Sequence, residues 1–183
     1  MQFDYIIIGA GSAGCVLANR LTNNNQNKVA LFEAGAPSDI WKVKMPLALL
    51  YTMHDPKYNW KYYSEPEPHL NNRRLFCPRG KMIGGSSAHN GMVFVRGNRN
   101  DYERWESSGL KSWSYDKVLS YFKKIENWSE GENQYRGSLG LLPVNLSKNN
   151  NPLFKAFLGA ASEAGHKINP DMNGEYQEGF GMF

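Results

Sequence analysis

Three glycines near the N-terminus have the spacing of a dinucleotide-binding turn. The run Gly9-Ala10-Gly11-Ser12-Ala13-Gly14 fits G-x-G-x-x-G, directly follows an apolar stretch and directly opens a helical pattern. In such a turn Gly9 allows the tight bend, Gly11 lets a pyrophosphate approach the helix N-terminus, and Gly14 lets the helix pack on the strand. Glu33 follows 19 residues after Gly14, where a carboxylate accepts hydrogen bonds from an adenosine ribose and repels a 2′-phosphate. The spacing predicts a site for NAD or FAD rather than NADP. The alternative is a glycine-rich turn that binds no ligand.

A second glycine-rich segment favours FAD over NAD. It reads Arg79-Gly80-Lys81-Met82-Ile83-Gly84-Gly85-Ser86-Ser87-Ala88-His89-Asn90-Gly91-Met92. Two adjacent glycines followed by two serines offer close backbone approach, hydroxyl donors and a helix start, which suits a second contact with a long anionic cofactor. A simple NAD domain has no obvious use for this segment.

The second segment, continued to Gly97, resembles the first signature of the glucose-methanol-choline (GMC) oxidoreductases, in particular their choline dehydrogenase-like members. The likeness extends in order over nearly the whole sequence, through residues 4–21, 33–35, 101–105, 121–124, 151–153 and 177–181. The resemblance implies an FAD-dependent oxidoreductase that converts an alcohol to an aldehyde or ketone by hydride transfer to flavin N5.

The resemblance also implies which residues contact FAD. The ADP half would lie against Gly9, Gly11, Ser12, Ala13, Gly14, Glu33 and Ala34. The pyrophosphate, ribityl chain and isoalloxazine would lie along Arg79, Met82, Gly84, Gly85, Ser86, His89, Asn90, Gly91, Met92 and Val93, with Asn90 to Met92 beside the ring.

His89 stands where most family members have an aliphatic residue. In this respect the order Ser87-Ala88-His89-Asn90 resembles members whose histidine is joined covalently to the flavin 8α-methyl carbon. A neutral imidazole can add to the electrophilic tautomer of the flavin, so a covalent bond is chemically reasonable. The alternative is a buried histidine packed against a non-covalent flavin, and both interpretations stay open.

The remaining aromatic and histidine residues carry weaker predictions. Trp60, Tyr62 and Tyr63 could line a quaternary-ammonium pocket through cation–π contacts, but such a cluster is more often part of a core. The other three histidines have no nucleophile or metal-ligand spacing nearby and are expected to be ordinary surface residues: His54, His69 and His166.

The elements that position these residues form a βαβ unit at the N-terminus. A continuous apolar strand at 4–8, expected to be buried on both faces, precedes a helix over 12–21 and a second strand at 28–32. The fold class is α/β, a Rossmann-like FAD-binding fold that starts a doubly wound sheet, incomplete, with the beginning of a substrate-binding α+β domain. We place the FAD-binding domain at 1–150, with an excursion at about 45–75, and the truncated start of the substrate-binding region at 151–183.

Two more helices are marked by capping residues. Ser114 can cap a helix with an apolar stripe at Val118, Phe122 and Ile125. Asn151 can cap another that starts at Pro152, carries an apolar face and stops at Gly165, the face being Leu153, Phe154, Phe157, Leu158 and Ala161.

The resemblance places the catalytic histidine base in a C-terminal segment beyond residue 183, so no residue here is expected to be a catalytic base. The expected partners are a small alcohol, choline among the candidates, and an electron acceptor such as oxygen or a quinone. Two other classes stay open: an NAD-dependent dehydrogenase, and an inactive truncated fragment or nucleotide-binding module without turnover.

Composition and charge exclude several classes of partner. The net charge of +4 is scattered without a basic tract, which argues against nucleic-acid binding, and no apolar run reaches the roughly 18 residues of a membrane span. The N-terminal residues lack the basic region of a secretory signal, so we predict a cytoplasmic protein and leave peripheral membrane association open. Cys15 and Cys77 have neither a metal-binding nor a disulfide pattern and are expected to be plain thiols.

Overall fold

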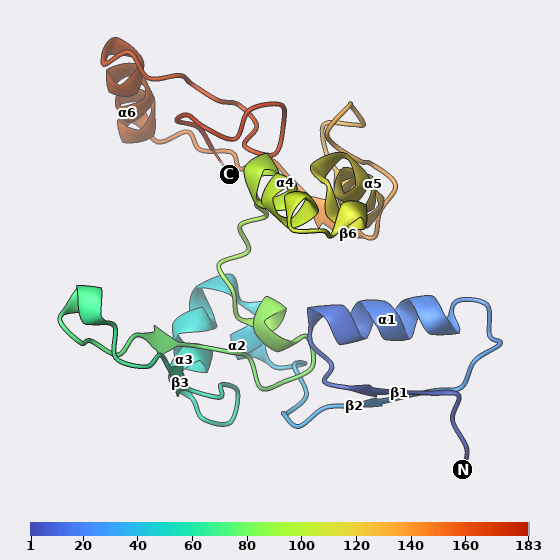
Figure 1. Ribbon diagram of the computed structural model, residues 1–183. Coiled ribbons are helices and arrows are strands. Elements are labelled where there is room, and N and C mark those ends of the chain that lie inside the picture. The colour runs from blue at the N-terminus through green and yellow to red at the C-terminus, as the bar shows by residue number, and fades with distance from the viewer. Residues whose placement is uncertain (183) are drawn as a thin grey trace. The chain divides into compact units, whose positions relative to one another are not determined.

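The computed structural model describes residues 1–182 and divides the chain into two compact units, Met1–Met92 (unit 1) and Val93–Phe183 (unit 2) (Figure 1). Phe183, the last residue of the predicted 151–183 region, lies outside the described residues. Over residues 1–182, no helix combines the length and the apolar character that a membrane crossing needs.

Unit 1 begins with the predicted βαβ unit. Strand β1 (Tyr5–Ile8) leads into helix α1 (Ser12–Thr22), and strand β2 (Val29–Phe32) then pairs parallel to β1, with Ile6 opposite Ala30. The Asn-rich stretch after the helix makes the return turn, in which Asn25 adopts a left-handed conformation (φ +57°). All three predicted elements are confirmed to within one residue at each end.

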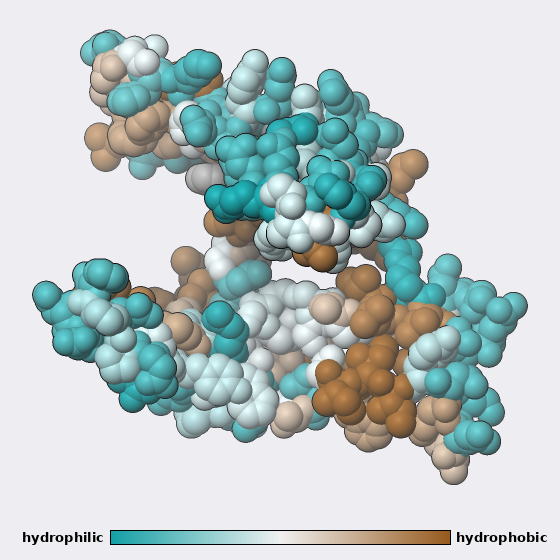
Figure 2. Space-filling view, in the orientation of Figure 1, coloured by the Kyte–Doolittle hydropathy of each residue, from teal (hydrophilic) through white to brown (hydrophobic). Residues whose placement is uncertain are grey.

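The two strands are less buried than their continuous apolar sequence predicts. Within the described residues they form a two-stranded sheet, in which Ile6 is 64% exposed, Ile8 81% and Phe32 56%. Figure 2 shows the resulting apolar patch over β1, β2 and α1. A βαβ unit covers only one face of its sheet with its own helix, and that is why the expectation of burial on both faces fails for this chain.

The rest of unit 1 consists of short elements around the second glycine-rich segment. The helices are α2 (Trp41–Lys44) and α3 (Leu49–His54), with 3₁₀ helices η1 (Pro46–Ala48), η2 (Pro68–Leu70) and η3 (Gly85–Ala88). Strands β3 (Tyr62–Tyr63) and β4 (Phe76–Cys77) pair antiparallel. Strand β3 lies within the predicted excursion at about 45–75, and residues 65–70 between the two strands are all exposed.

Unit 2 is helical with one small parallel sheet. Its helices are α4 (Arg99–Ser107), α5 (Tyr115–Ile125) and α6 (Pro152–Glu163), with 3₁₀ helix η4 (Lys111–Trp113). Strands β5 (Glu126–Trp128) and β6 (Leu142–Val144) pair with each other. Helix α4 was not predicted, because its nine residues carry mostly polar side chains and show no apolar stripe.

The two predicted caps of unit 2 differ in chemistry. Asn151 caps α6 as predicted, since its Oδ1 accepts from the Leu153 amide at 2.9 Å, and Gly165 follows the helix with φ +82°. Ser114 occupies the N-cap of α5, but its side chain makes no capping hydrogen bond. The predicted apolar face of α6 is only partly covered: Ala161 is buried, whereas Leu153 is 78% exposed and Phe157 55%.

A buried group of charges holds unit 2 together. The Glu126 side chain is fully buried and forms ion pairs with Arg96 and with Arg136, whose Nε lies 3.5 Å from Glu126 Oε2. Arg136 also pairs with Asp171 at 3.5 Å and lies over the Trp128 ring at 3.8 Å. Burial lowers the pKa of Arg136, while the neighbouring acids Asp171 and Glu126 raise it in part. The cluster joins residues up to 75 positions apart, between 96 and 171.

Candidate dinucleotide-binding site

The first glycine motif forms the predicted strand-to-helix turn. Gly9 has φ +96°, a conformation that favours glycine, and its amide donates to the carbonyl of Phe32 at 2.7 Å. A methyl group on Gly14 would lie 2.0 Å from the Gly9 carbonyl oxygen, so only glycine permits this approach of α1 to the end of β1. The predicted packing role of Gly14 is therefore visible directly in the geometry.

Open space and free amides meet where the helix starts. A methyl group on Gly11 would meet nothing within 4 Å, in contrast to Gly14. The first-turn amides of Ser12 and Ala13 have no acceptor within α1, because the carbonyls that would bond them precede the helix. Such amides, together with the positive end of the helix dipole, suit the negative oxygens of a phosphate.

Glu33 has a structural task that its spacing does not reveal. Its Oε2 accepts from the Ala10 amide at 2.7 Å and its Oε1 accepts from the Gly35 amide at 2.8 Å. The carboxylate therefore ties the end of β2 to the glycine turn after β1. Because each carboxylate oxygen has two lone pairs, acceptor capacity remains for ribose hydroxyls.

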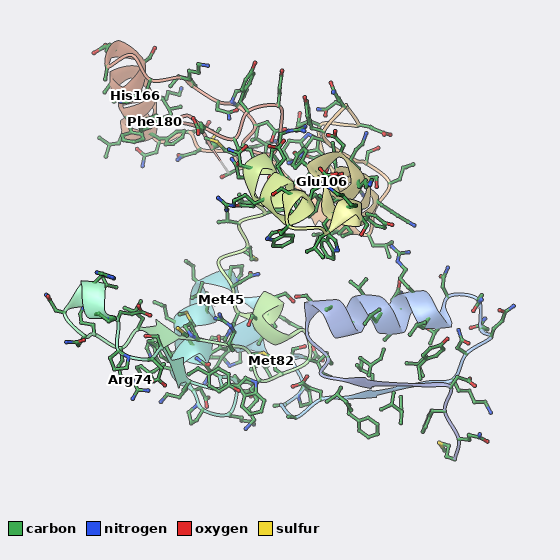
Figure 3. The ribbon with its side chains drawn as sticks, in the orientation of Figure 1. Met45, Arg74, Met82, Glu106, His166 and Phe180 are labelled. Carbon is green, nitrogen blue, oxygen red and sulfur yellow. The ribbon has the colours of Figure 1, made fainter. Side chains whose placement is uncertain are left out.

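The second glycine-rich segment lies directly on the first. The Gly84 amide donates to the Ala10 carbonyl at 2.7 Å, and a methyl group on Gly85 would lie 2.8 Å from the Gly11 Cα. Met82 is completely buried beside this junction (labelled in Figure 3), and a bridge links it to Ala36 after β2. Two segments about 75 residues apart in sequence thus form one backbone surface.

The end of this segment holds an unpartnered buried nitrogen. His89 is 7% exposed, and its Nδ1 has no hydrogen-bond partner among residues 1–182. Burial lowers the pKa of His89, which keeps the imidazole neutral near pH 7. A buried polar atom without a partner is rare in folded proteins and suits a site completed by a further molecule.

Beyond His89 the backbone is strained and exposed. Met92 has φ +56°, in the left-handed region that its side chain disfavours, and its amide donates to Asn90 Oδ1 at 2.9 Å. A methyl group on Gly91 would meet nothing within 4 Å, and Met92 and Val93 are 64% and 60% exposed. Backbone strain of this kind persists where the surrounding structure fixes it, and it often accompanies ligand contacts.

One buried residue of this region was missed by the sequence interpretation. Asn59 is 2% exposed, and its Oδ1 accepts from the Arg79 amide at 3.0 Å and from the Lys61 amide at 2.8 Å. Arg79 itself is exposed, and its Nη1 donates to the Pro78 carbonyl at 2.8 Å. No local pattern marks Asn59, because its partner lies 20 residues away in sequence.

The weaker candidates do not join this site. Trp60, Tyr62 and Tyr63 are 42–55% exposed, so the expectation that they form a core is wrong. The Trp60 ring stacks on Tyr62 and already carries Lys81 Nζ at 4.8 Å from its centroid. A cavity of unit 2, about 490 Å³, is lined by Phe157, Gln177, Phe180 and neighbouring residues and contains none of the predicted site residues.

The other histidines and the cysteines behave as expected. His54 and His69 are exposed, and His54 stacks on Phe76 with ring centroids 5.7 Å apart. His166 is exposed and lies 5.0 Å from the Phe180 ring; both residues are labelled in Figure 3. Cys15 and Cys77 are free thiols. Within residues 1–182 no cluster of three or more His, Cys, Asp or Glu could hold a metal ion.

Comparison with known proteins gives a consistent result. The family model described as GMC oxidoreductase matches residues 3–183. The chain is 52% identical to an oxygen-dependent choline dehydrogenase of Sinorhizobium fredii, covering 100% of this chain and 33% of that protein. Among solved structures, pyridoxine 4-oxidase from Mesorbium loti is 32% identical with a TM-score of 0.86, covering 94% of this chain and 34% of that one. An FAD-dependent oxidoreductase from Chaetomium thermophilum is 29% identical with a TM-score of 0.80, covering 94% and 31%.

These findings confirm the family and the fold class that the two glycine segments predict. The chain spans about a third of the length of the curated relatives that it matches. The match therefore concerns the portion that contains both glycine segments.

Proposed function

This chain belongs to the GMC oxidoreductase family, and from that premise we propose that it provides the FAD-binding part of an enzyme that oxidises an alcohol. The observation that carries the proposal is the junction of the two glycine segments, in which Gly84 and Gly85 lie on Ala10 and Gly11 beside open space and free helix amides. The similar FAD-dependent oxidoreductase from Chaetomium thermophilum supports the same cofactor.

The residues present fit FAD by their chemistry. We assign the ADP half to residues 9–14 and Glu33–Ala34, where the first-turn amides of α1 can donate to the phosphate oxygens and Glu33 retains lone pairs for ribose hydroxyls. We assign the flavin half to the stretch from Arg79 to Val93. There Met82 and Gly85 are buried in the scaffold, whereas Asn90 to Val93 are exposed.

When bound, FAD supplies the hydride acceptor, flavin N5, so that a primary or secondary alcohol leaves as an aldehyde or ketone. The contribution of this chain is to bind and orient the cofactor. Asn90 holds the strained Met92 backbone through its Oδ1, which fixes the residues proposed to lie beside the ring. We propose no catalytic base within these residues and place that group in a further segment of the enzyme.

The proposed substrate class is a small alcohol, with choline as the first compound to test because the curated relatives are named choline dehydrogenases. The proposed electron acceptor is oxygen, a quinone or another small carrier. We retain residues 1–150 as the FAD-binding domain and 151–183 as the start of a substrate-binding region. The two compact units, which meet after Met92, reflect how the chain packs, and we assign no separate function to either of them. The cytoplasmic location stays a prediction for cell fractionation to check.

The test is an absorbance spectrum of the purified chain after incubation with FAD and removal of free cofactor. We expect flavin bands for the native chain and their loss in Gly11→Ala, because a methyl group there enters the space assigned to the pyrophosphate. Gly159→Ala is the matched control, since a methyl group there also meets nothing within 4 Å but lies in α6 of unit 2. Absence of flavin bands in the native chain, or equal bands in all three proteins, would contradict the proposed site.

Acid precipitation of the same sample separates the two states of His89. If flavin stays with the pellet of the native chain but moves to the supernatant in His89→Asn, the flavin is bound covalently through this imidazole. Flavin that moves to the supernatant indicates that His89 only packs against the cofactor. The neutral, buried imidazole is compatible with both states.

A further inference from the structure

The Asn59 side chain bonds to the backbone of Arg79, the first residue of the second glycine segment. Its amide contacts three parts of unit 1 at once. Oδ1 accepts from Arg79 N and Lys61 N, and Nδ2 donates to the carbonyl of Met53 in α3. Both acceptor lone pairs are used, and the group is 2% exposed.

The Arg79 amide that Asn59 holds sets the position of the residues that follow. Asn59 and Gly80 form an antiparallel bridge, flanked by Trp60 N to Arg79 O at 2.9 Å and Lys81 N to Tyr58 O at 2.8 Å. Residues 79–81 therefore run as a short strand against residues 58–60, and the Asn59 side chain fixes the first amide of that strand.

From this strand a series of close contacts leads to the start of α1. The Gly80 amide donates to Ser86 Oγ at 3.1 Å, and a methyl group on Gly80 would lie 2.1 Å from the Gly85 carbonyl oxygen. Gly84 N then donates to Ala10 O at 2.7 Å. Displacement of Arg79 would move Gly80, and the tight Gly80–Gly85 contact would pass that movement to the residues that face Gly11.

We propose that Asn59 is a positioning residue: through the Arg79 amide it holds the second glycine segment in place for the cofactor before the cofactor binds. The inference rests on the proposed function for the identity of the cofactor, but the positioning itself is a property of the ligand-free chain. An unpartnered buried amide is costly, so loss of the Asn59 acceptor should loosen residues 79–86 locally.

Three substitutions isolate this role. Asn59→Leu removes all three hydrogen bonds at similar size. Asn59→Asp keeps both acceptors for Arg79 N and Lys61 N but loses the donor to Met53 O. Thr52→Val is the matched control, because Thr52 is equally buried nearby and its Oγ1 donates only within α3, to Leu49 O at 2.9 Å.

The first readout is amide hydrogen exchange of the ligand-free chain, followed by segment. We expect Asn59→Leu to speed exchange over residues 79–86 by about tenfold or more, with Thr52→Val leaving that segment unchanged. Asn59→Asp should leave 79–86 close to the native rate and loosen residues 49–54 instead. Native exchange of 79–86 in Asn59→Leu, or loosening of 79–86 by Asn59→Asp to the same extent, would overturn the inference. If Asn59→Leu does not fold, Asn59→Asp decides: faster exchange in residues 49–54 with native exchange in 79–86 supports the inference, and faster exchange in 79–86 overturns it.

The second readout is FAD affinity of the same proteins, measured by flavin fluorescence well below each thermal midpoint. We expect about tenfold weaker binding in Asn59→Leu and less than about twofold change in Thr52→Val. A native chain that binds no FAD would refute the proposed function, while hydrogen exchange would still decide whether Asn59 positions the segment. If the native chain binds FAD and Asn59→Leu binds it with the same affinity, the positioning role of Asn59 is refuted and the proposed function stands.

Discussion

Close backbone contacts at glycines occur in both units, but unit 2 also contains a buried cluster of charged side chains. Methyl groups on Gly137 and Gly140 of unit 2 would lie 2.0 and 2.1 Å from a carbonyl oxygen. In unit 1, methyl groups on Gly14, Gly35 and Gly80 would each lie within 2.1 Å of a backbone atom of another segment. In unit 2, Glu126 is completely buried between the guanidinium groups of Arg96 and Arg136.

The two units should therefore differ in their response to the loss of a buried charge. A site that binds a long cofactor along the polypeptide backbone needs that backbone to be accessible, and glycine meets this need because it adds no side chain. Unit 2 contains long loops between short elements, and buried charges with many hydrogen-bonding groups can join such loops at specific points. Both units should therefore be sensitive to atoms added at these glycines, and unit 2 should also be sensitive to lost charge.

The largest expected effect is loss of the buried carboxylate of unit 2. Glu126→Ala leaves buried Arg96 without its anion and Arg136 paired only with Asp171, which should lower the free energy of unfolding by about 3–5 kcal/mol in urea denaturation. Glu132→Ala is the matched control, because Glu132 is 56% exposed in an ion pair with Lys123 and should change stability by less than about 1 kcal/mol. Equal effects of the two changes would show that the buried cluster does not stabilise unit 2.

A smaller effect is expected from one added methyl group in unit 1. Gly14→Ala places a methyl group 2.0 Å from the Gly9 carbonyl oxygen, and overpacking of this kind costs about 1–3 kcal/mol. The matched Gly159→Ala in α6 meets nothing within 4 Å and should raise stability by about 0.5–1 kcal/mol, as glycine-to-alanine changes inside helices do. If thermal denaturation gave the same sign for both changes, the close approach at Gly14 would not determine stability.

The smallest expected effect is a pH dependence that comes from His89. Burial lowers the pKa of His89 in the folded state. As the pH is lowered through about 6.5, the unfolded chain therefore binds a proton before the folded chain does, and the free energy of unfolding decreases. His89→Asn should flatten the slope of unfolding free energy between pH 7.5 and about 5.5, while His69→Gln controls for the removal of an exposed histidine of unit 1. If the slope of unfolding free energy against pH were the same in His89→Asn as in the native chain, burial of this imidazole would not contribute to the loss of stability in acid.

Much of unit 1 could be predicted because its signals are local. The strand at Tyr5–Ile8, the turn at Gly9 and the helix from Ser12 each depend on residues within a few positions of one another. The cap at Asn151 was predictable for the same reason, since its acceptor and the Leu153 amide are two residues apart. Helix α4 was missed because its polar sequence carries no apolar period.

Residue types at fixed short spacings were sufficient to predict the βαβ start, the glycine turn and the family. Only the tertiary structure decided that Gly84 lies on Ala10, that Asn59 holds Arg79, and that Arg96 meets Glu126. These pairs are 20 to 74 residues apart. Their approach depends on how several loops close together, and no periodic pattern along the chain encodes that closure.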